Sequence, residues 1–389
     1  MNALTTARKA GVRHGAIPAE ARAVLTINLA ALRANWRELN KVSGKAECAG
    51  VIKADAYGLG LEEIAHALRD EGCKTFFVAT LAEASRIRNV EPSAAIYVLD
   101  GLLPGAAGYY AGFDLRPCLS SLSEIREWAA FCDATGRRLR AAVHIDTGIN
   151  RLGLPADEVS TLAAEQALFD HFELALVMSH LACSDEPAHP MNRAQRMRFD
   201  ELRAKLPPAP ASLANSGGVF LGPEYHYDLV RPGIALYGGR VLQGGPNPMQ
   251  WVVRLQARIL QVRELNAGEQ IGYGATFRVE RPSRVATLAC GYADGFLRAL
   301  SGTAVKPGPV GFIGEHPVPV VGRVSMDLIT VDVTDVPREL AQRGAWVEVM
   351  GARTTIDDLT DRAGTIGYEL LTRLGRRVHR VYLDTAESC

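Results

Sequence analysis

The segment best suited to covalent chemistry is residues 51–60, which read VIKADAYGLG. An apolar, β-prone run leads into Lys53, and a turn with two glycines follows it. At the carboxyl end of a barrel strand, where catalytic groups gather, such a lysine is partly removed from water. A desolvated lysine loses its proton more easily and can form a Schiff base with a carbonyl compound. Tyr57 and the paired glycines favour this interpretation over an ordinary surface lysine.

Alternating strand and helix patterns around this segment predict a parallel barrel. Eight short β-prone runs alternate with helical patterns, at residues 47–52, 75–79, 94–99, 114–118, 139–145, 173–180, 211–213 and 227–230. Strands that alternate with helices form a parallel sheet, and eight such units close into a (β/α)8 barrel.

The pattern changes past Met249, where apolar runs are separated by Gly and Pro turns and few helical stretches remain. This pattern predicts a second, mostly β domain. We therefore expect an α/β fold, with an N-terminal (β/α)8 TIM-like barrel and a C-terminal mostly-β domain. The expected boundaries are a tail at residues 1–22, the barrel at 23–249 and the β domain at 250–385, and the first strand, residues 23–29, is open to assignment to the β domain.

Composition excludes several classes of protein. The 43 basic and 43 acidic residues cancel, so there is no basic surplus to bind nucleic acid. No apolar run approaches the roughly 18 residues of a membrane span. The seven cysteines are scattered without a CxxC pair, which indicates reduced thiols and neither disulfides nor a metal site. The first 22 residues are polar and basic, unlike a secretory signal, so the cytoplasm is the expected location.

Residues 53–60 closely resemble the pyridoxal 5'-phosphate (PLP) motif of the alanine racemase family. Further motifs of that family follow in order at residues 146–148, 151–153, 179–181, 215–216, 230–238, 273–277, 291–295, 321–323, 326–327 and 368–369. Each motif alone is weak, but the ordered set is specific. The resemblance implies a PLP-dependent enzyme that interconverts L-alanine and D-alanine and supplies D-alanine for peptidoglycan.

The resemblance also implies two catalytic bases. Racemisation removes a proton from one face of Cα and returns it on the other, so two bases on opposite faces are wanted. By resemblance, Lys53 serves the D-alanine face and Tyr292 the L-alanine face. Tyrosine has a pKa of about 10 in water, so Tyr292 must be tuned by neighbours, by resemblance His180 and through it Arg231. In the family, Tyr292 and Met326 come from the partner subunit of a head-to-tail homodimer.

The remaining roles implied by the resemblance are in binding. Arg151 and the Met326 backbone N–H would hold the substrate carboxylate, for which a planar guanidinium is suited. Arg231 would face the pyridine nitrogen of PLP, where its permanent charge disfavours protonation of the ring. The phosphate would be held by Tyr57, Ser216, Gly233, Ile234 and Tyr368. Because Lys53, His180, Ser216 and Arg231 end or closely follow predicted strands, we expect them to converge on one rim of the barrel.

Two positions depart from the family pattern. His144 stands where many members have a carbamylated lysine that fixes the carboxylate-binding arginine, so we expect Arg151 to be oriented differently, through water or an anion. Ser212 stands where many members have a histidine that supports the pyridine-facing arginine. A hydroxyl is shorter, so we expect Arg231 to rest on a water molecule instead.

Other functions remain open at this level. A racemase for serine or for a broader set of amino acids shares the same motifs. A non-catalytic PLP-binding protein resembles the barrel alone, and the second domain with Tyr292 argues against it. A basic-amino-acid decarboxylase of the same two-domain plan generally uses a cysteine–aspartate element from its second domain, where this chain has residues 291–295.

Overall fold

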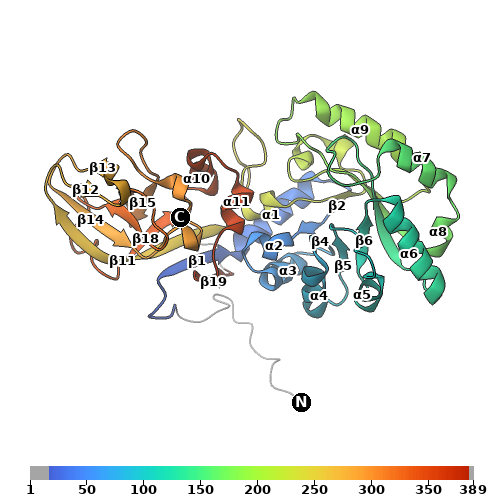
Figure 1. The fold of residues 1–389 in the computed structure, drawn as a ribbon, viewed down its shortest axis with the longest axis horizontal. Coiled ribbons are helices and arrows are strands. Elements are labelled where there is room, and N and C mark those ends of the chain that lie inside the picture. The colour runs from blue at the N-terminus through green and yellow to red at the C-terminus, as the bar shows by residue number, and fades with distance from the viewer. Residues whose placement is uncertain (1–16, 385–389) are drawn as a thin grey trace, which may run out of the picture. The chain divides into compact units, whose positions relative to one another are not determined.

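The computed structural model describes residues 17–384, which fall into two compact units (Figure 1). One unit comprises residues 33–236 and 240–248. The described part of the other comprises residues 17–32, 237–239 and 249–384.

The first unit is built on a parallel sheet that closes on itself. Seven of its strands pair in chain order, namely β3 (Gly50–Val51), β4 (Thr75–Val78), β5 (Ala95–Val98), β6 (Arg116–Leu119), β7 (Arg140–His144), β8 (Glu173–Met178) and β9 (Ala211–Ser212). The eighth, β10 (Leu229–Val230), pairs in parallel with β2 (Glu47–Cys48), which directly precedes β3. The Asp228 N–H donates to the Ala211 carbonyl at 3.0 Å and so links β10 to β9. The predicted barrel is confirmed.

Helices follow most of the barrel strands, as Figure 1 shows. They are α2 (Lys53–Tyr57), α3 (Leu61–Asp70), α4 (Leu81–Val90), α5 (Ala107–Gly112), α6 (Leu122–Thr135), α7 (Ala156–Ala164), α8 (Leu168–His171) and α9 (Pro190–Arg203), with α1 (Leu29–Val42) before β2. After β9 and β10 the chain forms only short 3₁₀ turns, at Gly218–Phe220, Pro223–Tyr225 and Ile234–Tyr237. Apolar side chains such as Phe76, Trp128 and Phe172 are fully buried, and each contributes roughly 1.5–3 kcal/mol of burial free energy.

The strand expected at residues 114–118 begins later in the structure. The run at residues 114–118 was expected to be a strand, but β6 begins at Arg116. Asp114 has a φ of 48°. A left-handed residue cannot belong to a regular strand, so the chain turns there and enters the sheet two residues later.

The second unit is a mostly antiparallel sheet with its long strand, β11 (Val253–Leu265), at the centre. β11 pairs antiparallel with β1 (Ala23–Asn28), β14 (Ser283–Leu288) and β18 (Trp346–Met350), and β1 pairs in parallel with β19 (His379–Leu383). The other elements are β12 (Gln270–Ile271), β13 (Phe277–Arg278), β15 (Val310–Ile313), β16 (His316–Pro319), β17 (Ile329–Asp332), α10 (Ile356–Ala363) and α11 (Gly367–Thr372). The mostly-β character expected for this part of the chain is confirmed, and residues 23–28 lie in this sheet.

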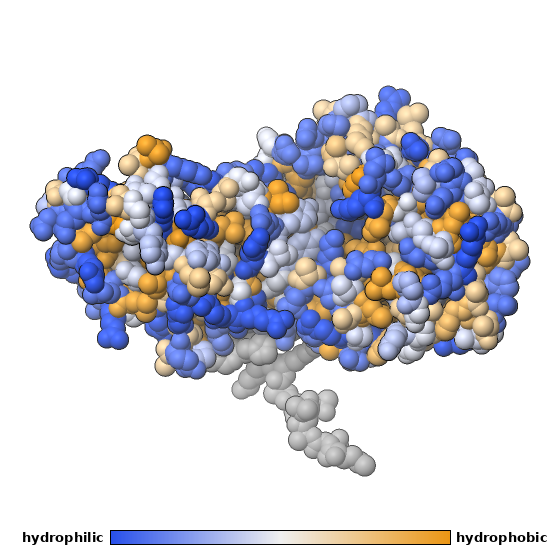
Figure 2. All heavy atoms as spheres, in the orientation of Figure 1, coloured by the Kyte–Doolittle hydropathy of each residue, from blue (hydrophilic) through white to orange (hydrophobic). Residues whose placement is uncertain are grey.

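On the face drawn in Figure 2, hydrophilic and hydrophobic residues are interspersed over both units. Among residues 17–384, no helix is both long and apolar enough to cross a membrane. The same residues contain no group of three or more His, Cys, Asp or Glu side chains placed to hold a metal ion.

Candidate active site

Lys53 lies at the carboxyl end of a barrel strand, as the sequence predicts. β3 ends at Val51, and the half-buried lysine begins α2 two residues later. Burial lowers the pKa of Lys53, and the positive charge of Arg151 lowers it further, although Asp100 and Glu83 act in the opposite direction. At a given pH, a larger fraction of Lys53 is therefore neutral than of an ordinary lysine, and the neutral amine is the form that reacts covalently.

The turn after Lys53 has an unusual backbone. Ala54, Asp55 and Ala56 have φ and ψ near +50°, and Tyr57 continues with a φ of 57°. These four residues form a left-handed helical turn without a glycine, and Gly58 ends it with a φ of 81°. Left-handed geometry costs about 1–2 kcal/mol for each non-glycine residue. Strain of this size persists only where neighbouring structure restrains the chain, and it is commonest at functional sites.

Tyr57 and Ser216 both lie against Gly233, which closely follows β10, and Ile234 is the next residue of the chain. The Ser216 hydroxyl oxygen accepts the Gly233 N–H at 2.8 Å and the Ala235 N–H at 3.3 Å, which leaves its own hydrogen for another partner. A Cβ at Gly233 would collide with the Tyr57 hydroxyl, so glycine is required there. The hydroxyls and the close backbone form a cradle of hydrogen-bonding groups that suits a phosphate.

Arg231 is 4% exposed and sits among neutral groups. Its guanidinium donates to the Ser212 hydroxyl and to the Ser179 carbonyl, and it lies 5.8 Å from the Phe77 ring centroid. Burial lowers the pKa of Arg231 to about 10, so the side chain stays charged at neutral pH. Within residues 17–384, no carboxylate forms an ion pair with it.

The expectation that Arg231 rests on water at Ser212 is wrong. The Ser212 hydroxyl donates to the Leu229 carbonyl at 2.6 Å, which turns its lone pairs towards Arg231. The short side chain reaches the guanidinium directly because both residues are fully buried at neighbouring strand ends. Ser212 thus supports the arginine with a neutral acceptor.

His144 and His180 are both neutral at physiological pH. Burial lowers the pKa of His144 to about 4, and it lowers the pKa of His180 well below the ordinary value, in both cases with a further contribution from Arg231. The Ser120 hydroxyl donates to the Cys118 carbonyl at 3.2 Å and lies 3.3 Å from His144 Nδ1. Ser120 can therefore accept from Nδ1–H, which leaves Nε2 of His144 as a buried acceptor without a hydrogen-bond partner.

Arg151 lies in an exposed loop beside these groups. Its positive charge lowers the pKa of Lys53, His144 and His180, which places it in their neighbourhood. Within the described chain, no hydrogen bond joins Arg151 to His144, and none joins the side chains of His180 and Arg231. The special orientation of Arg151 by His144 and the relay through His180 therefore stay predictions.

The remaining predicted site residues belong to the β unit and are exposed. Tyr292, Met326 and Tyr368 have 41%, 54% and 41% of their surface accessible. The Tyr292 N–H donates to the Ser325 carbonyl at 3.0 Å and the Ala293 N–H to the Met326 carbonyl at 3.0 Å, so Tyr292 and Met326 lie on adjoining turns. Their placement against the barrel residues stays a prediction.

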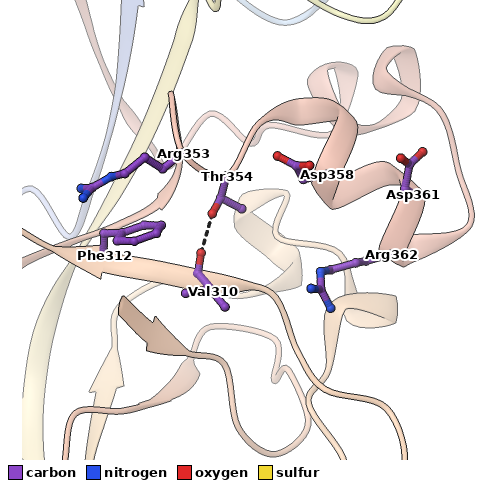
Figure 3. A pocket seen from close by; sticks show the side chains of 7 residues that line it. All are labelled: Val310, Phe312, Arg353, Thr354, Asp358, Asp361 and Arg362. Atoms are coloured by element: carbon purple, nitrogen blue, oxygen red, sulfur yellow. Dashed lines mark hydrogen bonds between the residues drawn. The ribbon is translucent and has the colours of Figure 1, made fainter. Parts of the chain in front are cut away.

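A separate hollow in the β unit is lined by side chains that hold the fold together. It has a volume of about 530 Å³ and is drawn in Figure 3 with its lining residues Val310, Phe312, Arg353, Thr354, Asp358, Asp361 and Arg362. Arg353 stacks on Phe312, Thr354 donates to the Val310 carbonyl, and Asp358 caps α10. These polar groups are already engaged in holding the fold.

The two units correspond to two families of known domains. Residues 27–241 match the model of the alanine racemase N-terminal domain, and residues 252–382 match that of the alanine racemase C-terminal domain. The chain belongs to the alanine racemase family.

Relatives across the alanine racemase family match nearly the whole chain. A protein named alanine racemase from Methylobacterium sp. (strain 4-46) is 52% identical over 360 residues, covering 92% of this chain and 97% of the relative. One from Rhizobium meliloti (strain 1021) is 48% identical, covering 93% and 97%. The crystal structure of alanine racemase from Bartonella henselae with covalently bound pyridoxal phosphate has a TM-score of 0.87 and 40% identity, covering 93% of this chain and 99% of that one.

Sequence motifs of the family do not reveal the contacts that support the site, even where, as at Ser179, the residue lies within a motif. Glu83 accepts the Asp55 N–H in the left-handed turn, and Ser179 accepts from Arg231 through its backbone. Thr80 and Glu83 have the spacing of a capping box, which predicts the start of α4 but not the contact with Asp55. The other contact, to a backbone carbonyl, leaves no mark in the sequence.

Proposed function

We propose that this protein is an alanine racemase that uses PLP and two bases, Lys53 and Tyr292 of a partner subunit. The observation that carries the proposal is a lysine of lowered pKa at the carboxyl end of a barrel strand, together with the Ser216–Gly233 cradle and a buried arginine that forms no ion pair within residues 17–384. The whole-length match to alanine racemases supports the same activity and the same cofactor.

The described residues fit PLP. Ser216, Tyr57 and the Gly233–Ile234 backbone would hold the phosphate, with Tyr368 completing the set. Arg231 would face the ring nitrogen with a fixed positive charge and thereby keep that nitrogen unprotonated. When bound, PLP binds the substrate amine and withdraws electrons from Cα, which makes the Cα proton removable.

The two bases would then move one proton across Cα. A neutral Lys53 accepts the proton from D-alanine or returns it, and burial together with Arg151 favours this neutral form. Tyr292 would exchange the proton on the opposite face through its phenol. Arg151 and the Met326 N–H would bind the carboxylate and so fix which face each base meets.

A head-to-tail homodimer would complete each site. Tyr292 and Met326 are exposed on adjoining turns of the β unit, where a second copy can reach them. A symmetric pair of such contacts gives two equivalent shared sites. The proposed setting is the cytoplasm, with D-alanine supplied for peptidoglycan.

The test is to incubate the PLP-loaded protein with L-alanine in heavy water. Cα–H exchange is followed by NMR and the enantiomer ratio by chiral chromatography. Exchange with approach to a racemic mixture supports the proposal, whereas exchange with retained L-configuration contradicts the two-base assignment. Failure with alanine but turnover of serine, lysine or arginine indicates another racemase, and failure with all of them indicates a non-catalytic PLP-binding protein.

A further inference from the structure

The carboxylate of Glu83 joins two segments that are distant in sequence. Its Oε1 accepts the Asp55 N–H at 3.1 Å, in the middle of the left-handed turn. Its Oε2 accepts the N–H groups of Ala79 at 3.0 Å and Thr80 at 3.3 Å, at the start of α4. One oxygen therefore serves the turn after Lys53, and the other serves the helix on which Glu83 lies.

The left-handed turn lacks an internal partner for this N–H group. Inside the turn, the Ala56 N–H donates to the Ile52 carbonyl at 2.8 Å and the Gly58 N–H to the Ala54 carbonyl at 2.8 Å. The first N–H groups of any helical turn have no carbonyl behind them. Glu83 supplies the acceptor for Asp55 with a charge, which makes the hydrogen bond stronger than one to a neutral oxygen.

α4 holds Asp55 at a second point, through Arg86. Arg86 follows Glu83 by three positions, so both side chains lie on one face of the helix. Arg86 donates to the Asp55 carboxylate at 2.9 Å and to Glu62 at 2.7 Å. The backbone of Asp55 is held by Glu83 and its side chain by Arg86, and the strained turn is fixed against α4 from two sides.

We propose that Glu83 is a positioning residue for Lys53, because its carboxylate holds the left-handed turn that begins at the next residue. This inference rests on the proposed function for the importance of Lys53, while the restraint itself is a property of the fold. Glu83 also contributes negative charge near the lysine amine. The charged groups that act on the pKa of Lys53 are Arg151, Arg231, Asp100 and Glu83, and the last two raise it.

The experiment compares Glu83→Gln with Thr80→Ala in the PLP-loaded protein. Glutamine has one oxygen, so it cannot accept from both Asp55 and the start of α4. Thr80→Ala removes the side-chain cap that accepts the Glu83 N–H, and it leaves the Glu83 carboxylate in place. The two variants should weaken α4 similarly, but only Glu83→Gln should release the turn.

The first readout is hydrogen exchange at the Asp55 amide. We expect roughly tenfold faster exchange in Glu83→Gln, from the loss of a charge-assisted hydrogen bond, and no more than about twofold in Thr80→Ala. The second readout is the pH profile of kcat with D-alanine. Loss of the negative charge lowers the pKa of Lys53, so the acid limb should move to lower pH in Glu83→Gln alone.

Equal Asp55 exchange in the two variants would overturn the inference and leave Glu83 as an ordinary helix cap. An unshifted acid limb in Glu83→Gln would do the same for its action on Lys53. If the wild-type chain turns over no alanine, the proposed function fails, while the exchange measurement still decides whether Glu83 restrains the turn.

Discussion

Lys53 and Tyr292 each lie on a short turn, and in each turn a carboxylate accepts backbone N–H groups. Glu83 accepts from the Asp55 N–H beside Lys53, and Asp294 accepts the Gly291 N–H at 2.9 Å beside Tyr292. The carboxylates do the same structural task in a barrel loop and in a β-unit loop. Chemistry that depends on an atom's position requires such restraint, because loops are otherwise mobile.

The two turns differ in how the backbone reaches its shape. The Lys53 turn holds four non-glycine residues in left-handed geometry and so stores conformational strain. The Tyr292 turn places glycine where space runs out: a Cβ at Gly291 would overlap the Met326 carbonyl, and one at Gly295 would lie 2.7 Å from the Arg373 carbonyl oxygen. The Lys53 turn is strained but has room for side chains, whereas the Tyr292 turn is unstrained but has no room for a side chain at its glycine positions.

The electrostatic support differs as well. Around Tyr292, Arg377 forms ion pairs with Asp294 at 3.0 Å and with Asp327 at 2.7 Å. Around Lys53 the cations Arg151 and Arg231 have buried, neutral histidines as neighbours. The guanidinium groups of Arg151 and Arg231 suit anions, such as a phosphate and a substrate carboxylate, although the carboxylates of Asp100 and Glu83 also act on Lys53.

The largest expected effect comes from removing each base in turn. Lys53→Ala and Tyr292→Phe should both slow alanine racemisation by about 10³-fold or more, because each removes one of two proton-transfer groups. In heavy water, however, Tyr292→Phe should still exchange the Cα–H of D-alanine with retention, since Lys53 remains on that face. NMR and chiral chromatography measure both quantities. Exchange of L-alanine that survives in Tyr292→Phe would break the assignment of faces.

A second prediction concerns Gly295 in the Tyr292 turn. Gly295→Ala adds a Cβ next to the Arg373 carbonyl at a φ of 104°, so we expect a loss of about 3 kcal/mol in the free energy of unfolding. Gly364→Ala is the matched control, because Gly364 also has a positive φ, 70°, but open space around it. It should cost only about 1 kcal/mol. Urea unfolding gives both values, and equal losses would show that packing does not restrict Gly295.

The neutral histidines make stability depend on pH. The pKa of His144 is about 4 in the folded chain and about 6.5 when unfolded, so the unfolded state binds more protons between these values. Stability is therefore full above pH 6.5 and falls as the pH drops towards 4, by about 1 kcal/mol per pH unit from this residue. His144→Asn should reduce the slope of stability with pH in urea unfolding at pH 5 and 6, leaving the part that is due to His180, with no change in slope between pH 7 and 8. An unchanged slope at acid pH would mean that His144 is not held neutral.

Hydrophobic patterns and family motifs predict much of this fold and site, but they do not predict contacts between residues that are distant in the sequence. Hydrophobic periodicity gives the eight barrel strands, and the family motifs mark residues 53–60 and 291–295 as parts of the site. Nothing in the sequence Ala-Asp-Ala-Tyr signals left-handed geometry, because each of these residues normally prefers negative φ. Arg231 shows the same limit: its residue type was informative, but its direct contact with Ser212 depended on strand positions that only the fold supplies.

The smallest expected effect tests whether the strain beside Lys53 is real. Ala54→Gly removes a left-handed penalty of about 1–2 kcal/mol and adds about 0.5–1 kcal/mol of chain entropy, so the free energy of unfolding should rise by about 0.5–1 kcal/mol. Ala82→Gly, on the exposed face of α4, should lower it by about 1 kcal/mol. Opposite signs for the same substitution would establish that the Lys53 turn stores strain. If both variants lose stability equally, the left-handed geometry of the Lys53 turn has no free-energy cost, and the contrast with the glycine-based Tyr292 turn disappears.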